Sequence, residues 1–299
     1  MMLLGLCASM HTASGTLSSR HDVYGFEDVA LPPLPSGARL VLGESRPKVP
    51  GSSSSAVAGE SHDTMMWSKL REYVALHERD DAGACGVGGE VWPAASALCE
   101  WLGNHSAEVC GSRILELGSG TGACGLYAAA LGAASVQLTD GGPVELISLA
   151  RANILRNRHL FRAGSSVEAR RLRWEEHSPL PRDADLIIAS DVWYRHADGA
   201  ANAALARTLR ELLDQPPKPR AIVAHEHRSR EAPFDATLPR WDADDELLEA
   251  FAAAAREHGL RLEGLWSRRP RCHVRGSFRS WDADVSIVEV VRDPDAADG

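Results

Sequence analysis

Residues 113–125 read RILELGSGTGACG. A short apolar run, Ile114, Leu115 and Leu117, leads into a turn with glycines at 118, 120, 122 and 125. A small-residue apolar segment then continues to Leu131. This order predicts a strand, a glycine turn and a helix. Glycine has no Cβ and adopts positive φ, so a ligand can approach the backbone closely. The free N–H groups at the start of the helix favour a carboxylate or phosphate. The stretch therefore predicts a site for a nucleotide-like cofactor.

Strand and helix patterns alternate through the rest of the chain, and this alternation predicts an α/β fold. The expected strands are 113–117, 135–139, 167–172, 185–190, 220–225, 260–266 and 284–291. The expected helices are 94–102, 122–131, 143–158, 198–213 and a last one that starts near Asp242, with Asp245 at capping-box spacing, and ends at Gly259. We therefore expect a Rossmann-like, seven-stranded, mostly parallel twisted sheet with helices on both faces. No helix separates the final two strands, so the last strand should be antiparallel.

Composition bounds the organisation of the chain and its partners. Residues 1–60 are rich in Pro, Gly and Ser, which predicts a flexible N-terminal extension. We expect a helical lead-in over 61–110, the folded domain over 111–292 and a disordered tail over 293–299. The net charge of −9 gives no reason to expect nucleic acid, and no apolar run approaches the ~20 residues that cross a membrane. The six cysteines form no CxxC pair, which favours reduced thiols in the cytoplasm. An organelle-targeting role for residues 1–20 stays open, as does the oligomeric state.

Two cofactor classes compete for the glycine turn. The pattern G-x-G-x-x-G from Gly120, with Asp140 about 20 residues on, also fits a dinucleotide site. Three details favour S-adenosylmethionine instead. Glu116 stands two residues before Gly118, where it can serve the network around the amino-acid end of that cofactor. The glycine motif begins only after about 110 residues, and a predicted helix precedes it. The fourth strand ends in DVWY, residues 191–194, which a dehydrogenase does not need.

Asp140 is expected at the carboxyl end of the second strand, on the edge where open α/β sheets bind ligands. A carboxylate there can accept hydrogen bonds from both ribose hydroxyls. The alternative is a helix cap or turn residue in the sequence Asp-Gly-Gly, and one side chain can serve both purposes.

The chain from about Glu90 to Val291 resembles the seven-β-strand methyltransferases of the family-16, protein-lysine type. The markers, in chain order, are VWP at 91–93, the turn 116–122, Thr139-Asp140, LRW at 172–174 and DxxY at 191–194. The resemblance and the turn together give these candidate cofactor-binding residues: Trp92, Glu116, Gly118, Ser119, Gly120, Gly122, Asp140, Trp174 and Ser190. Trp174 could instead be a core residue, and Trp92 a hydrophobic staple at a helix entry.

The resemblance implies transfer of methyl groups from S-adenosyl-L-methionine to a lysine side chain of a protein substrate. Asp191 and Tyr194 are then the candidate catalytic residues: Asp191 attracts and orients the charged lysine, and Tyr194 lines its channel. Trp193, Arg195 and His196 depart from what we expect of the family, so the target stays open. Alternatives are a small-molecule acceptor, another protein side chain such as histidine, or a non-catalytic cofactor-binding scaffold.

His225 and His227 stand at the end of the fifth strand, and residues two apart face the same side of a strand. Two such histidines could hold a metal ion. The sequence shows no third ligand nearby, and methyl transfer of this type needs no metal. We therefore expect no metal site.

Overall fold

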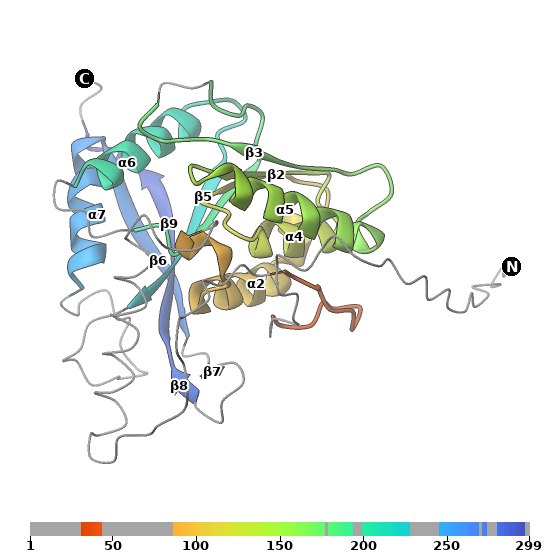
Figure 1. Cartoon of the computed structure of the whole chain (residues 1–299). Helices are drawn as coiled ribbons and strands as arrows, with labels where there is room; N and C mark the ends of the chain where they lie inside the picture. Colours follow the sequence, from red (N-terminus) through yellow and green to blue (C-terminus); the bar gives the residue numbers. More distant parts are fainter. Residues whose placement is uncertain are drawn as a thin grey trace, which may run out of the picture.

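The computed structural model describes residues 31–43, 86–176, 179–193, 199–227, 245–268, 271–273 and 280–296. Its centre is a seven-stranded sheet in the order β3-β2-β1-β4-β5-β9-β6 (Figure 1). These strands are β1 (Arg113–Leu117), β2 (Ser135–Asp140), β3 (Ser166–Arg171), β4 (Leu186–Ser190), β5 (Arg220–His227), β6 (Leu260–Arg268) and β9 (Asp284–Arg292). The first five pair in parallel, and β9 lies antiparallel between β5 and β6. The predicted α/β class and antiparallel last strand are confirmed.

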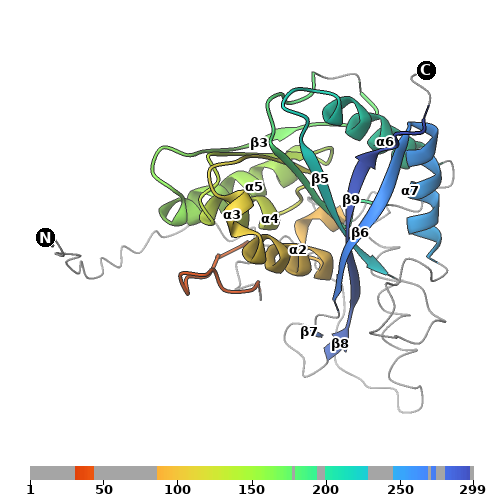
Figure 2. The same cartoon turned by 180° about the vertical axis from the view of Figure 1, so that it is seen from behind.

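Helices cover both faces of this sheet. Figures 1 and 2 show α2, α4 and α5 on one face and α6 and α7 on the other. The helical segments are η1 (Gly86–Gly89), α2 (Pro93–Asn104), α3 (Ser106–Val109), α4 (Ala123–Ala130), α5 (Val144–Asn157), η2 (Arg158–Leu160), α6 (Ala200–Leu213) and α7 (Glu246–Glu257). In the part of the chain that the structure describes, no helix combines the length and apolar character that crossing a membrane requires.

Strand β1 shows how the sequence builds two apolar layers. Side chains alternate between the faces of a strand. Ile114 packs in the layer with α2, α4 and α5, whereas Leu115 and Leu117 pack in the layer with α6 and α7. Glu116 shares the face of Ile114, so its carboxylate is buried beneath α4. The chain order reverses between β1 and β4, and the carboxyl ends of strands at such a point form the ligand crevice of open α/β sheets.

Residues 31–43 belong to the packed structure, although the sequence analysis places them in a flexible extension. Leu34, Leu40 and Leu42 are buried in the core. The amide of Asn153 accepts from Gly43 N at 2.7 Å and donates to Gly43 O at 3.2 Å. One helical turn later, Asn157 bonds the N–H and C=O of Val41 at 2.9 and 2.8 Å. Two asparagines on α5 thus hold an extended segment more than 100 residues away in sequence. Residues 1–30 and 44–60 lie outside the described residues.

Several boundaries differ from the sequence expectation. β5 continues to His227 because it pairs with β9 as far as Asp284. α7 begins at Glu246, and Asp245 is its N-cap, accepting from Leu247 N and Leu248 N. The helix start expected near Asp242, with Asp245 inside the capping box, was wrong. Between β6 and β9, β7 (Arg271–His273) pairs antiparallel with β8 (Ser280–Asp282).

Candidate functional site

The turn after β1 is built so that no side chain occupies its surface. Gly118 and Gly120 have φ of 64° and 52°, in the left-handed region that L side chains rarely adopt. A Cβ at Gly118 would lie 2.6 Å from Val192 Cγ1, and one at Gly120 would lie 2.6 Å from Gly88 O in η1. The residues that approach this turn therefore come from after β4 and from before α2. Only bare backbone fits between them.

Hydrogen bonds fix the turn to the neighbouring strand. Ser119 N donates to Thr139 O at 2.9 Å, and Gly122 N donates to Ser119 O at 2.7 Å. Gly122 is the N-cap of α4, so these bonds place the start of the helix directly behind the turn. The predicted strand, glycine turn and helix are present, with Gly118, Ser119, Gly120 and Gly122 together on one loop.

Asp140 ends β2 and organises two loops. Its Oδ2 accepts from Gly120 N and its Oδ1 from Gly142 N, both at 2.8 Å. Burial raises the pKa of this carboxyl above its usual range, and the two backbone bonds oppose that effect. An ionised carboxylate offers about four acceptor positions. Each oxygen therefore keeps acceptor capacity for a ligand hydroxyl. The turn role and the ligand role, which the sequence left as alternatives, are compatible in one side chain.

Glu116 lies behind the turn rather than on its surface. The residue is 1 % exposed, and its Oε2 accepts from Gly125 N in the first turn of α4 at 2.9 Å. Burial raises the pKa of Glu116 to about 8, and the nearby Asp140 charge adds to the shift, while bonds from Gly125 and Cys124 oppose it. The carboxylate that the sequence assigns to the cofactor network thus supports the turn from beneath.

Trp174 lies against the glycine turn, whereas Trp92 stands at the start of α2. Two ring atoms of Trp174 lie 3.6 and 3.7 Å from the position that a Gly118 Cβ would take. The Trp174 indole Nε1 is buried and has no hydrogen-bond partner within the described chain. Trp92 is partly buried and is the N-cap of α2, with Pro93 in the first helical turn. Trp174 is therefore placed beside Gly118, another of the candidate cofactor-binding residues.

The loop after β4 carries the candidate catalytic residue. Asp191 has a φ of 55°, rare for a residue other than glycine, and its N–H donates to Ala224 O at 2.8 Å. Such strained positions gather at functional sites. Ser190, one residue earlier, accepts a hydrogen bond from the buried thiol of Cys124 in α4. Trp193 is 1 % exposed and stacks on Phe251 of α7 with ring centroids 4.8 Å apart. Tyr194 lies outside the described residues.

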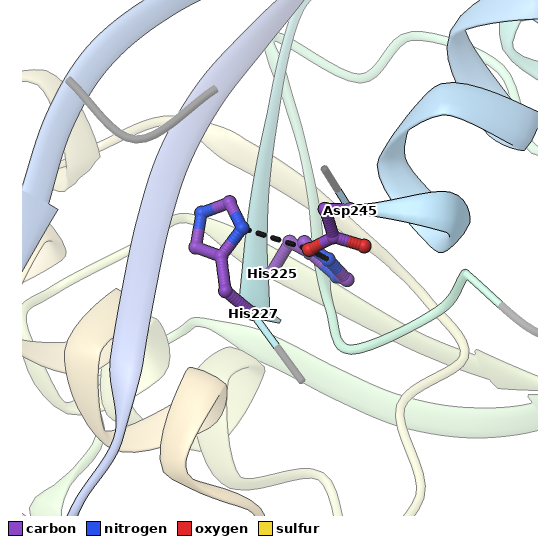
Figure 3. A group of neighbouring side chains, drawn as sticks. All are labelled: His225, His227 and Asp245. Atoms are coloured by element: carbon purple, nitrogen blue, oxygen red, sulfur yellow. Dashed lines mark hydrogen bonds and ion pairs between the residues drawn. The ribbon is translucent and has the colours of Figure 1, made fainter. Parts of the chain in front are cut away.

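The end of β5 carries a buried polar cluster that the sequence analysis found only in part (Figure 3). Asp245 Oδ2 lies 2.9 Å from His225 Nε2 and 2.8 Å from His227 Nδ1. Burial alone would raise the pKa of Asp245, but the bonds from both histidines hold it well below its usual range. Burial lowers the pKa of His225, against the raising effect of Asp245 and Asp191. The conclusion that no third ligand lies near the histidines was wrong. Asp245, the N-cap residue of α7, lies far from them in sequence and comes next to them only in the folded chain.

With this geometry established, comparison with known proteins decides the family. The family described as "Lysine methyltransferase" matches residues 71–236, which is more than half of the chain. The chain belongs to this family. The match confirms the expected family resemblance.

Individual relatives agree over part of their length. A calmodulin-lysine N-methyltransferase of Arabidopsis thaliana is 37% identical over 41% of this chain and 40% of its own length. The protein N-lysine methyltransferase METTL21A of Danio rerio is 38% identical over 36% of this chain and 49% of its own. The histone-arginine methyltransferase METTL23 of Xenopus laevis is 26% identical over 62% of this chain and 80% of its own. The chain thus spans less than half the length of the first two relatives.

Proposed function

We propose that this chain is an S-adenosylmethionine-dependent methyltransferase whose acceptor is a lysine side chain of a protein. The family match over residues 71–236 is the observation that carries the proposal. The named relatives that methylate protein lysine support the acceptor class. The arrangement at the carboxyl ends of β1, β2 and β4 supports the cofactor.

The residues at these strand ends fit a nucleoside with a charged amino-acid tail. Gly118 and Gly120 keep the backbone bare, and Asp140 keeps acceptor capacity for two ribose hydroxyls. The partly buried Trp174 indole supplies an aromatic surface beside the turn, and aromatic rings pack well against a base. When bound, the cofactor supplies a methyl group on a positively charged sulfur, which is already activated for transfer. The protein's contribution is then to position the acceptor and to exclude water.

Asp191 is the residue we assign to the acceptor. A lysine amine must be neutral to attack, and at pH 7 this costs roughly 4–5 kcal/mol for a free lysine with its pKa near 10.4. A carboxylate beside the amine favours the ammonium form, so Asp191 is poorly suited to be a strong base. Its proposed role is to attract and orient the charged lysine before the proton leaves. Tyr194, as the sequence suggests, would line the channel.

A methyl-transfer assay on the full chain tests this function. The purified chain is incubated with isotope-labelled S-adenosylmethionine and a cell lysate, and protein and metabolite fractions are separated. Calmodulin is included as a candidate because a relative is named for it. Label on lysine of a protein, absent with Asp191→Ala, supports the proposal. Label on arginine, as the name of the Xenopus relative suggests, or in the metabolite fraction would contradict the lysine assignment.

The compartment is part of the same proposal. Three cysteines of the described chain, Cys99, Cys110 and Cys124, are free thiols, and two of them are buried. Free thiols persist in reducing compartments, which supports the cytoplasm. Fluorescence microscopy of the full chain, tagged at its C-terminus so that residues 1–20 stay free, tests this against organelle import.

A further inference from the structure

The side chains of His225, His227 and Asp245 converge on one point in the interior. Their ligand atoms all lie within 4.8 Å of one another, and the residues are between 1 % and 6 % exposed. The two histidines come from alternate positions of β5, and the aspartate comes from the N-cap of α7 (Figure 3). Seventeen residues, 228–244, separate the strand from the helix in sequence. Folding, rather than sequence proximity, makes this group.

Surrounding hydrogen bonds aim these ligands. Asp245 Oδ1 accepts from Leu247 N at 3.0 Å and Leu248 N at 3.2 Å, which leaves Oδ2 directed at the histidines. His227 Nε2 lies 2.6 Å from Ser286 Oγ. Metal-binding side chains are generally held in this way, with the far nitrogen of a histidine and the second oxygen of a carboxylate bonded to other groups. Asp245 and His227 therefore have the supporting bonds of a metal site, whereas His225 Nδ1 is buried with no hydrogen-bond partner among the described residues.

The donor set selects the kind of ion. Two imidazole nitrogens and one carboxylate oxygen suit Zn²⁺ and similar transition metals, whereas Mg²⁺ and Ca²⁺ prefer all-oxygen sites. Neutral imidazole binds through an unprotonated nitrogen, so its proton sits on the other ring nitrogen. With a metal ion bound at Nδ1 of His227, the ring proton would move to Nε2, which lies 2.6 Å from Ser286 Oγ and would donate to it. We propose that His225, His227 and Asp245 bind a divalent transition-metal ion of the zinc type, with three protein ligands.

The position of the ion gives it a structural role. It would join the end of β5 to the start of α7. His225 packs on Trp193 with ring centroids 4.6 Å apart, and Phe251 of α7 stacks on the same indole. Trp193 is two residues from the strained Asp191. A metal bond at this point would hold β5, α7 and the loop after β4 together, independently of whether the cofactor site is functional.

Metal content of the full chain, prepared without a histidine tag, tests the site. The protein is incubated with Zn²⁺, desalted and measured by inductively coupled plasma mass spectrometry. We expect one zinc ion per chain in the wild type. His227→Gln and Asp245→Asn should weaken zinc binding at least about 10–100-fold, the loss known for supporting partners alone. Asn at 245 keeps an oxygen for the helix cap, so α7 retains its start. His159→Gln, which removes an exposed histidine, is the matched control and should bind as wild type does.

Thermal melting supplies a second reading that does not need the variants to fold. A ligand that binds the native state raises its melting temperature. Zinc should therefore raise the melting temperature of chelator-treated wild type, and chelator should reverse the rise. Zinc retained by wild type and His159→Gln but lost from the two ligand variants supports the proposal. Wild type that retains no more zinc than the ligand variants, or whose melting temperature zinc leaves unchanged, would show a purely hydrogen-bonded cluster and overturn it.

Discussion

Substitution of Gly118 by alanine probes the backbone surface on which the cofactor assignment rests. The left-handed φ of 64° costs a residue with a Cβ about 1–2 kcal/mol. The new methyl group would also lie 2.6 Å from Val192 Cγ1, and overpacking of this kind costs about 1–3 kcal/mol. The two effects together predict a loss of about 2–5 kcal/mol in the free energy of unfolding. The chain can remain folded, since natural domains are stable by about 5–15 kcal/mol.

Gly164→Ala is the matched control. Gly164 has a φ of 83°, so alanine suffers the same kind of backbone strain, but nothing lies within 4 Å of its Cβ position. It stands in the loop before β3, and we expect a loss of about 1–2 kcal/mol with unchanged cofactor binding. Denaturant titration measures the stability of both variants, and isothermal titration calorimetry measures their affinity for S-adenosylmethionine.

Comparison of the two variants separates the effect of backbone strain, which both share, from the effect on the cofactor site, which only Gly118→Ala should show. For Gly118→Ala we expect the cofactor affinity to fall at least tenfold, about 1.4 kcal/mol, because the methyl group and the displaced Val192 or Trp174 narrow the site. Equal affinity in Gly118→Ala and Gly164→Ala, with the Gly118 variant folded, would refute the claim that the cofactor lies on this turn.

Three further changes test separate parts of the structure. Asp191→Ala should reduce methyl transfer by about 100-fold or more while leaving cofactor affinity nearly unchanged, because positioning of the reactants contributes most of the rate; equal loss of both would mean that Asp191 is structural. In the wild type, the Glu116 carboxyl keeps its proton up to about pH 8 in the native state but only up to about pH 4.5 in the unfolded state. Wild-type stability should therefore fall as the pH rises between these two values, and Glu116→Gln should remove this part of the pH dependence of thermal stability. A wild-type melting temperature that is constant over this range would disprove the raised pKa. Asn153→Ala should cost about 2–4 kcal/mol in denaturant titration, since it loses bonds to Gly43 and Thr121; a loss under ~0.5 kcal/mol would show that residues 31–43 contribute little.

Local pattern was enough to predict the sheet and the loops at its carboxyl edge. The apolar run of β1 and the glycines after it specify strand and turn within a dozen residues, and Asp140 follows β2 directly. In a parallel sheet, the residues after each strand meet at one edge. That rule alone brings Asp140 and Asp191 to the same edge as Gly118.

Contacts between distant segments could not be predicted in the same way. Asp245 meets the histidines of β5 because α7 begins beside that strand, and no spacing in the sequence encodes that approach. Asn153 and Asn157 hold residues 41–43 through backbone atoms, which carry no residue-specific signal. The burial of Glu116 is different, since its alternation with Leu115 and Leu117 already puts it on the opposite face, beneath the helix.

Calorimetric titration of S-adenosylmethionine into the full chain, with Asp140→Ala beside it, tests the central claim most directly. The account predicts one binding site per chain in the wild type and much weaker binding once the carboxylate at the end of β2 is removed. Absence of binding by the folded wild type, or full affinity in folded Asp140→Ala, would contradict a cofactor site at the carboxyl ends of β1 and β2.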